Sequence, residues 1–492
     1  MPKFIDIPRM KKTTLLIFLS LMAFFACKKE NTITTDPSCK LGFSADTVLF
    51  DTVFTSLGSS THHLKIYNNY QEDLKISEVR LMGGEQSRFK VNFDGEVGTE
   101  FHDKIVPARD SLFTFLNVTI DPTDAASPFI VEDSILFVTN GNRQLVKLVA
   151  YGQNAHYIIG DQTVSSFQYP FKIVADSLET THWYDDLPYV IYGYAMINSY
   201  GTLHIHEGVR IYCHSNSGIW SWSDGQLIVE GTAERPVTIQ GDRLEPYFKN
   251  QPGQWDRIGL MDGRTGADHI INHAIIRNGF IGIQPQSVFK GTQCALRINN
   301  TIVENHTGFG IYASYYAIEA NNLVIDNCGQ YAFCVDQGGD YLIRHATIGN
   351  YWWNSTRTTP SLAFTNFFDL DGTRYEYPFH FEMGNSIMYG TLENEFVASL
   401  SGNEVDTTYL FDHCLIKSAK YANAPAGFNG CIFNQDPMFV DYRSYDLHLS
   451  DILSPAVGAG SPAIGASVPY DLDGNSRLGT PDLGAYQLRT EK

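Results

Sequence analysis

The sequence predicts an all-β protein in which a β-sandwich is followed by a long stack of parallel strands. Three observations lead to this prediction. Short runs of alternating apolar and polar residues, which are typical of strands, recur through residues 41–155. A seven-residue pattern then returns at intervals near 22 residues, which is the signature of a repeat fold. The 41 Gly, 31 Phe and 27 Tyr favour strands and turns over helices.

The first 26 residues are predicted to be a targeting segment. Residues 9–12 are basic, and residues 14–26 form an apolar run that ends in a small residue before Cys27. This run is too short for a transmembrane helix and fits a signal peptide. The small residue followed by cysteine resembles the lipobox of bacterial lipoproteins, although Phe24 stands where that family usually has Leu. The resemblance implies cleavage before Cys27 and a lipid on its sulfur, and a secretory signal with an unmodified cysteine is the alternative.

Residues 27–40 are polar and are predicted to form a lipidated tether. Lys28, Lys29 and Glu30 resemble the charged signal that sends some Bacteroidota lipoproteins to the cell surface. We therefore expect a lipid-anchored protein of the outer membrane, displayed at the cell surface, with a periplasm-facing anchor as the alternative. No later apolar run reaches the roughly 18 residues of a transmembrane helix, so the lipid is the expected contact with the membrane.

The chain is strongly acidic. Its formal net charge is −19, and it becomes −22 without the first 26 residues, which carry four basic residues and one acidic residue. Such a surface repels nucleic acid, so no nucleic-acid partner is expected. Besides Cys27 the sequence has seven cysteines, none of them in a CxxC pair, which argues against a zinc ribbon or a redox motif.

Residues 41–155 are predicted to form an immunoglobulin-like β-sandwich. Six alternating runs, separated by turn residues, are found at 63–68, 74–81, 89–93, 112–120, 134–140 and 145–152. An Asn-rich turn at 68–69, a strand from Leu74 to Ile76 and an Ile-Asp-Pro turn at 120–122 resemble a family of bacterial Ig-like modules. That resemblance implies a spacer or a protein-binding unit.

Residues 156–492 are predicted to form a parallel β-solenoid with a C-terminal cap. Copies of one pattern occupy residues 273–279, 300–306, 322–328 and 345–351, each with Asn at the sixth place. These residues, Asn278, Asn305, Asn327 and Asn350, are separated by 27, 22 and 23 positions. Stacked coils lie about 4.8 Å apart, so like residues align, and asparagine at a turn can adopt αL geometry and bond the next asparagine.

The opening coils carry a second pattern. It comprises Leu203, Ile205, Gly208, Gly231, Thr232, Pro236, Val237, Ile239, Trp255 and Ile258. In this order the residues resemble right-handed β-helix lipoproteins of the pectate-lyase-like superfold, and residues 461–487 resemble the closing segment of that group. The resemblance covers most of residues 200–487 and implies a right-handed single-stranded parallel β-helix. It implies no single function, because this fold hosts lyases, hydrolases, adhesins and binding proteins.

One dense group of polar residues is the candidate for an active site. It consists of Asp262, Arg264, Asp268, His269 and His273. A glycoside hydrolase needs two carboxylates at a fixed separation, and a polysaccharide lyase needs a cation and a base. The alternative is a polar turn without catalytic function, and the familiar polygalacturonase motifs are absent from the sequence.

Calcium is the possible cofactor suggested by the end of the chain. Asp471, Asp473, Asn475 and Asp482 offer oxygen ligands in an order related to an EF-hand loop, but Ser476 stands at the position of its glycine. The alternative is a terminal cap in which Arg477 pairs with a carboxylate. We expect the cap and no resident cofactor.

His204 and His206 alternate with Leu203 and Ile205 and therefore share one face of a strand. A zinc site there would need further ligands from neighbouring coils. A solvated pair of histidines is the expected alternative.

Aromatic residues near coil turns are candidates for glycan contacts. Trp220 and Trp222 lie two residues apart on one face, and Trp352 and Trp353 open a long insertion. Aromatic rings can stack on sugars, whereas packing against insertions is the alternative. We predict a non-enzymatic binding or structural protein of the cell envelope whose partner is a glycan or an envelope protein. A polysaccharide lyase or glycoside hydrolase is the alternative.

Overall fold

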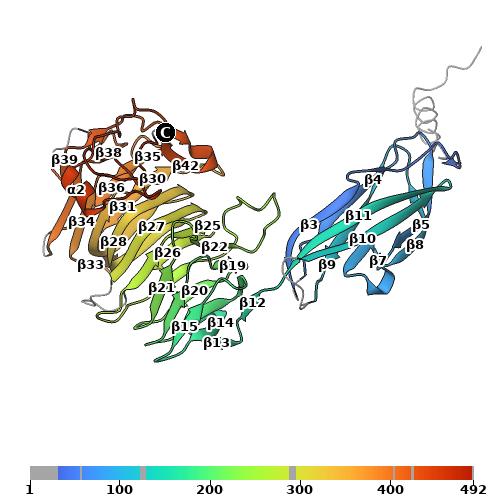
Figure 1. The fold of residues 1–492 in the computed structure, drawn as a ribbon, viewed down its shortest axis with the longest axis horizontal. Helices are drawn as coiled ribbons and strands as arrows, with labels where there is room; N and C mark the ends of the chain where they lie inside the picture. Colours follow the sequence, from blue (N-terminus) through green and yellow to red (C-terminus); the bar gives the residue numbers. More distant parts are fainter. Residues whose placement is uncertain are drawn as a thin grey trace, which may run out of the picture. The chain divides into compact units, whose positions relative to one another are not determined.

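The structure is a computed structural model that describes residues 32–55, 58–121, 129–287, 295–402, 405–422 and 426–489. The chain divides into two compact units, residues 1–153 and 154–492. Nearly all regular structure is β, as the alternation predicts (Figure 1). Within the described residues the one α-helix is α2 (Pro462–Ser467).

Two sheets share one hydrophobic core in the first unit. One sheet contains β1 (Ile33–Thr34), β3 (Thr47–Phe54), β5 (Asp73–Leu81), β8 (Glu100–Val106), β10 (Phe129–Thr139) and β11 (Asn142–Gln153). The other contains β2 (Gly42–Phe43), β4 (His62–Tyr67), β6 (Phe89–Phe93), β7 (Glu96–Gly98) and β9 (Ser111–Val118). Each of the six alternating runs coincides largely with a strand, and three of the runs extend one or two residues beyond it. The sequence did not predict β3, where apolar residues are adjacent, or β8, whose residues are mostly polar.

The second unit is built on one repeat-like, mainly parallel sheet that connects β12 (His156–Ile159) to β40 (Ile432–Phe433). From β14 (Phe167–Ala175) to β24 (His269–Asn272), each strand pairs in parallel with the strand three places later in the chain. For example, β15 (Thr180–Trp183) pairs with β18 (Thr202–Ile205), and β18 pairs with β21 (Gln226–Glu230). The chain therefore returns to the same ladder after every three strands, and one such set of three is called a coil below. The coils follow one another from green to red in Figure 1.

The strands of the early coils are short. They are β12 (His156–Ile159), β13 (Gln162–Val164), β14 (Phe167–Ala175), β15 (Thr180–Trp183), β16 (Tyr189–Tyr192), β17 (Tyr194–Ile197), β18 (Thr202–Ile205), β19 (Arg210–Cys213), β20 (Gly218–Ser221), β21 (Gln226–Glu230), β22 (Val237–Gly241), β23 (Ile258–Leu260), β24 (His269–Asn272), β25 (Ala274–Arg277) and β26 (Ile281–Pro285). Every second side chain points into the core, as Leu203 and Ile205 of β18 do.

The strands of the later coils differ in length. They are β27 (Ala295–His306), β28 (Phe309–Cys328), β29 (Phe333–Arg344), β30 (Thr347–Asn350), β31 (Leu362–Thr365), β34 (Phe379–Gly384), β35 (Ile387–Gly390), β36 (Phe396–Ser399), β37 (Thr407–Asp412), β38 (Leu415–Ile416), β39 (Phe428–Asn429) and β40 (Ile432–Phe433). The first three, β27, β28 and β29, are long because each continues through more than one ladder of the sheet. Between β31 and β34 an antiparallel hairpin is inserted, β32 (Phe367–Leu370) with β33 (Thr373–Glu376).

The asparagine pattern forms a buried hydrogen-bonded ladder. Asn305 Nδ2 donates to Asn278 Oδ1, and Asn327 Nδ2 donates to Asn305 Oδ1, each at 2.7 Å. All three residues have the positive φ of an αL turn. The predicted fourth member does not continue the ladder, because Asn350 Oδ1 accepts instead from the backbone N–H of Cys328. Asn278, Asn305 and Asn327 are called the asparagine ladder below.

The C-terminal segment folds back over the outer face of the later coils. It contains β41 (Phe439–Asp441), β42 (Asp446–Leu449) and α2. Leu447 and Tyr486 pack against Val324 of β28. Close by, Glu304 and Asp326 occupy neighbouring positions of β27 and β28, and burial raises the pKa of both carboxyl groups.

Candidate functional site

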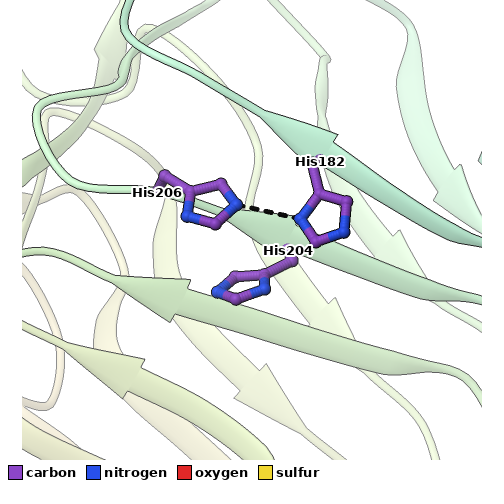
Figure 2. Close-up of side chains that lie close together, drawn as sticks. All are labelled: His182, His204 and His206. Atoms are coloured by element: carbon purple, nitrogen blue, oxygen red, sulfur yellow. Dashed lines mark hydrogen bonds between the residues drawn. The ribbon is translucent and has the colours of Figure 1, made fainter.

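Three histidines meet on the outer face of two early coils (Figure 2). His182 of β15 and His204 of β18 are paired in register, and His206 follows directly after β18. One ring nitrogen from each residue lies within 4.8 Å of the others. His182 is exposed, whereas His204 and His206 are half-buried. These residues are called the histidine cluster below.

Hydrogen bonds and ring contacts order the histidine cluster. His182 Nδ1 lies 2.9 Å from His206 Nε2, and His204 Nε2 lies 2.6 Å from Glu230 Oε2. The His206 ring stacks between His204 and Tyr184, at centroid distances of 4.1 Å and 4.5 Å. Burial lowers the pKa of His206, and the neighbouring His204 and His182 lower it further. The lowered pKa favours the neutral imidazole of His206, in which one ring nitrogen is unprotonated and can donate its lone pair to a metal ion.

The sequence identified two members of this cluster and missed the third. His204 and His206 were recognised because they lie two residues apart on one strand face. His182 comes from the preceding coil, 22 residues earlier, and its register opposite His204 depends on the length of that coil. Because this separation of 22 residues equals the repeat period, it could have indicated that His182 lies beside His204 on the neighbouring coil.

A second feature is a groove on the outer face of β28, β29, β34 and β37. Its volume is about 500 Å³. The lining combines apolar and acidic side chains, among them Ala317, Glu319, Asp340, Leu342, Glu382 and Leu410. In-register pairing places these residues in columns that cross the strands.

One histidine of the groove is held between two carboxylates. His380 Nδ1 lies 2.8 Å from Asp340 Oδ1, and His380 Nε2 lies 3.1 Å from Asp406 Oδ2. The hydrogen bond with Asp406, together with that to Asp340, raises the pKa of His380 although partial burial opposes the shift. Nothing in the sequence pattern indicated this group, because its members come from separate coils.

The polar residues predicted as an active site point in different directions. His269 is fully buried, accepts a hydrogen bond from the backbone N–H of Leu227, and has its pKa lowered to about 4 by desolvation. Asp268 forms an ion pair with Arg297 on the surface at 2.8 Å.

The other members of that predicted group also have local roles. Asp262 is buried and accepts a hydrogen bond from the Ser287 hydroxyl. Arg264 lies in a turn that bridges to Ala267, and His273 begins a repeat with the positive φ of an αL residue. These contacts favour a structural turn over an active site.

The predicted tryptophans are partly covered by their own unit. Trp220 and Trp222 both contact Phe167 of β14, with ring centroids 5.2 Å and 5.7 Å away, and both are half-buried. Trp352 is buried and donates its ring N–H to Ser355 Oγ. Trp353 keeps 43% of its surface exposed and is the most exposed of these four tryptophans.

The predicted calcium ligands accept hydrogen bonds from the protein itself. Asp471 accepts from the backbone N–H groups of Asn475 and Gln487, and Asp482 from those of Gly458 and Leu488.

Asp473 and Arg477 of the same segment also have partners within the protein. Asp473 pairs with His448 and Arg489. Buried Arg477 donates to the carbonyl oxygens of Tyr470, Gly484 and Ala485 rather than to a carboxylate. These contacts favour the terminal-cap interpretation over a calcium loop.

The predicted lipidation site, Cys27, lies outside the described residues. Six described cysteines, Cys39, Cys213, Cys328, Cys334, Cys414 and Cys431, are free thiols, and four of them are buried. Over the described part of the chain, no helix has the length and apolar character needed to cross a membrane.

Comparison with known proteins gives no family. No protein-family model and no curated protein matches the chain. Among solved structures, the chain is partially similar to a family 123 glycoside hydrolase from Clostridium perfringens, with 8% sequence identity and a TM-score of 0.17. The match covers 23% of this chain and 25% of the hydrolase chain.

Two further solved structures are similar over a quarter of this chain. A protein of unknown function from Porphyromonas gingivalis has 13% identity with 54% of its length covered, and a PapD-like domain of human CEP192 has 12% identity with 89% covered. Both TM-scores are 0.17. The match thus spans about a quarter of the length of the hydrolase and about half of the Porphyromonas protein.

Proposed function

We propose that this protein is a lipid-anchored lipoprotein of the cell envelope, displayed at the outer-membrane surface, that binds a neutral glycan without cleaving it. An Ig-like sandwich serves as the spacer, and a right-handed parallel β-helix carries the binding surface. The two-sheet core of the first unit and the three-strand pairing of the second support these architectures.

The groove on β28, β29, β34 and β37 carries the proposal. Neighbouring strands lie about 4.8 Å apart, so the groove extends roughly 14 Å from β28 to β37. Leu342 and Leu410 offer apolar surface for the C–H faces of sugar rings, while the carboxylates of Glu319, Asp340 and Glu382 can accept hydrogen bonds from sugar hydroxyls. The same carboxylates repel uronic acids, which favours a neutral glycan.

The positions of the protonatable carboxyl groups support binding without hydrolysis. A glycoside hydrolase needs a carboxylic acid with a raised pKa beside the scissile bond. Among the described residues, the carboxyl groups whose pKa is raised are Glu304 and Asp326. They are buried near Tyr445 and Tyr486 of the C-terminal segment and do not line the groove.

A panel of soluble neutral and uronate-containing polysaccharides, examined by affinity electrophoresis, tests the proposal. We expect retardation by a neutral polysaccharide and a loss of retardation in Leu410→Ala and Asp340→Asn. Asp369→Asn, on the exposed β32–β33 hairpin, is the matched control and should behave as wild type. Binding that is confined to uronates, or equal in all variants, would contradict the groove assignment.

The anchor needs a separate experiment. Cys27→Ser should release the protein from the membrane fraction in detergent-free fractionation, because no other membrane-seeking segment is evident in the mature sequence. A variant that remains wholly with the membranes would exclude lipid attachment at this residue.

A polysaccharide lyase or glycoside hydrolase is the second candidate. The observation that favours it is the position of His380 at the groove, between the carboxylates of Asp340 and Asp406. A histidine side chain can take up or release a proton near neutral pH and can therefore serve as a general acid or base. The same polysaccharide panel decides between the two functions. New reducing ends or unsaturated products in wild type, absent in His380→Gln, would establish the enzyme.

A further inference from the structure

We propose that His182, His204 and His206 bind one Zn²⁺ ion on the outer face of the early coils, with a fourth coordination position left for water or an external ligand. The three residues come from two stacked coils, so the site forms only when the coils are in register. This inference is independent of the glycan groove, which lies on later coils.

The spacing of the rings suits a small metal ion. Zinc binds imidazole nitrogen at about 2.0–2.1 Å, which places the nitrogens of a tetrahedral site about 3.4 Å apart. The candidate nitrogens lie within 4.8 Å of one another, and those of His182 and His206 are 2.9 Å apart. Small rotations of the side chains therefore bring all three to metal-binding distance.

The hydrogen bond between His182 and His206 is the contact that the metal replaces. In the hydrogen bond of 2.9 Å, one of the two neutral rings donates its N–H to the lone pair of the other. When the donating ring takes its other tautomer, its proton passes through solvent to its far ring nitrogen, and the lone pairs of both facing nitrogens become available to a metal. A divalent cation shared by three neutral donors satisfies all of them at once.

Glu230 positions His204. Its Oε2 accepts from Nε2–H of His204 at 2.6 Å, so Nδ1 is the nitrogen of His204 assigned to the metal. A carboxylate bonded to the far nitrogen of a metal-bound histidine fixes the ring and makes the ligand more basic. The His204 ring now stacks on His206 and must turn about its side-chain torsion to bind, a motion that its partly exposed position permits.

The nearby cations do not oppose a divalent ion. Arg210 and Arg235 both pair with Asp185, at 3.3 Å and 3.1 Å, and Arg235 also pairs with Glu207 at 2.6 Å. Their charges are thus compensated within the same surface.

The experiment measures Zn²⁺ binding to the purified full chain, first stripped with chelator, by isothermal titration calorimetry and by metal analysis after dialysis. We expect one Zn²⁺ per chain in wild type. His182→Gln, His204→Gln and His206→Gln should each weaken binding at least about tenfold. His156→Gln should not, because His156 pairs with Asp186 and does not belong to the histidine cluster. Circular dichroism verifies that each variant is folded.

Replacement by Co²⁺ supplies an independent readout of coordination. A tetrahedral site gives an intense visible absorption band, which should be lost in His182→Gln and shifted in Glu230→Gln with about tenfold weaker binding. Absence of Zn²⁺ binding at micromolar concentration, or equal binding in wild type and the three histidine variants, would overturn the site. Unchanged affinity and spectrum in Glu230→Gln would overturn the role of Glu230.

Discussion

The asparagine ladder and the histidine cluster are built in the same way and differ in what surrounds them. In both, parallel strands in register place polar side chains one above another on successive coils. Asn278, Asn305 and Asn327 are buried, with at most 3% of their surface exposed. His182, by contrast, is exposed, and His204 and His206 are half-buried.

The chemistry of the side chain explains the difference. An amide donates and accepts without carrying a charge, so a stack of asparagines satisfies itself in the absence of water. Stacked imidazoles compete for protons and repel one another once charged. The same register thus produces a structural ladder where the column is buried and a titratable, ligand-accessible group where it faces solvent.

Among buried polar contacts, we expect the largest loss of stability on substitution at the ion pair of Arg357 and Glu395. Both side chains are fully buried and form two parallel hydrogen bonds of 2.8 Å and 2.6 Å. Glu395→Ala leaves a buried guanidinium without a counter-ion, although the Thr359 and Asn350 carbonyl oxygens still accept from it, and we expect a loss of about 3–5 kcal/mol in the free energy of unfolding. Denaturant titration followed by circular dichroism measures it.

The control for this prediction is the exposed pair of Arg374 and Asp369. Asp369→Ala should leave the melting temperature unchanged, because solvent screens both charges. Equal effects of Glu395→Ala and Asp369→Ala would show that burial does not separate the two classes of polar contact.

The next largest effect is expected in the asparagine ladder. Asn327→Ala removes the bond to Asn305 and places alanine in an αL turn, which should cost roughly 1–3 kcal/mol. Asn216→Ala is the matched control, since Asn216 has the same backbone conformation but is exposed. A melting temperature lowered equally by both variants would mean that the ladder bond contributes nothing beyond the backbone.

Buried histidine should make the stability of the second unit depend on pH. His306 is fully buried, and desolvation lowers its pKa to about 4. Its unfolded form has a pKa near 6.5, so unfolding takes up a proton below that pH, and stability is present above about 6.5 and lost as the pH falls toward 4.

The expected slope is about 1.4 kcal/mol per pH unit between these limits. His306→Gln should reduce the slope of unfolding free energy against pH by that amount, whatever its effect at neutral pH. A slope identical to that of wild type would show that His306 is not held neutral in the folded protein.

The smallest effect is expected in the histidine cluster. His204→Gln removes a half-buried side chain, and we expect a change within about 0.5 kcal/mol in the presence of chelator. A larger loss of unfolding free energy would show that the histidine cluster contributes to stability as the buried asparagine ladder does, and would contradict the distinction between them. Thermal melts with and without Zn²⁺ measure this difference directly.

The sequence alone determined what depends on local spacing. Alternation over six runs predicted strands of the first unit because side chains of a strand alternate between its faces. The repeated Asn at the sixth place predicted the αL turns of Asn278, Asn305 and Asn327, because few residues tolerate that conformation. The same alternation placed His204 and His206 on one face.

Only the tertiary structure decided which distant residues meet. His182 joins His204 and His206 because one coil is 22 residues long, and the predicted polar group around His269 disperses because His269 faces the core while Asp268 faces solvent. Phe167 covers Trp220 and Trp222 from an earlier strand. Coil length, insertions and the returning C-terminal segment set these contacts, and none of them follows from the period of a single strand.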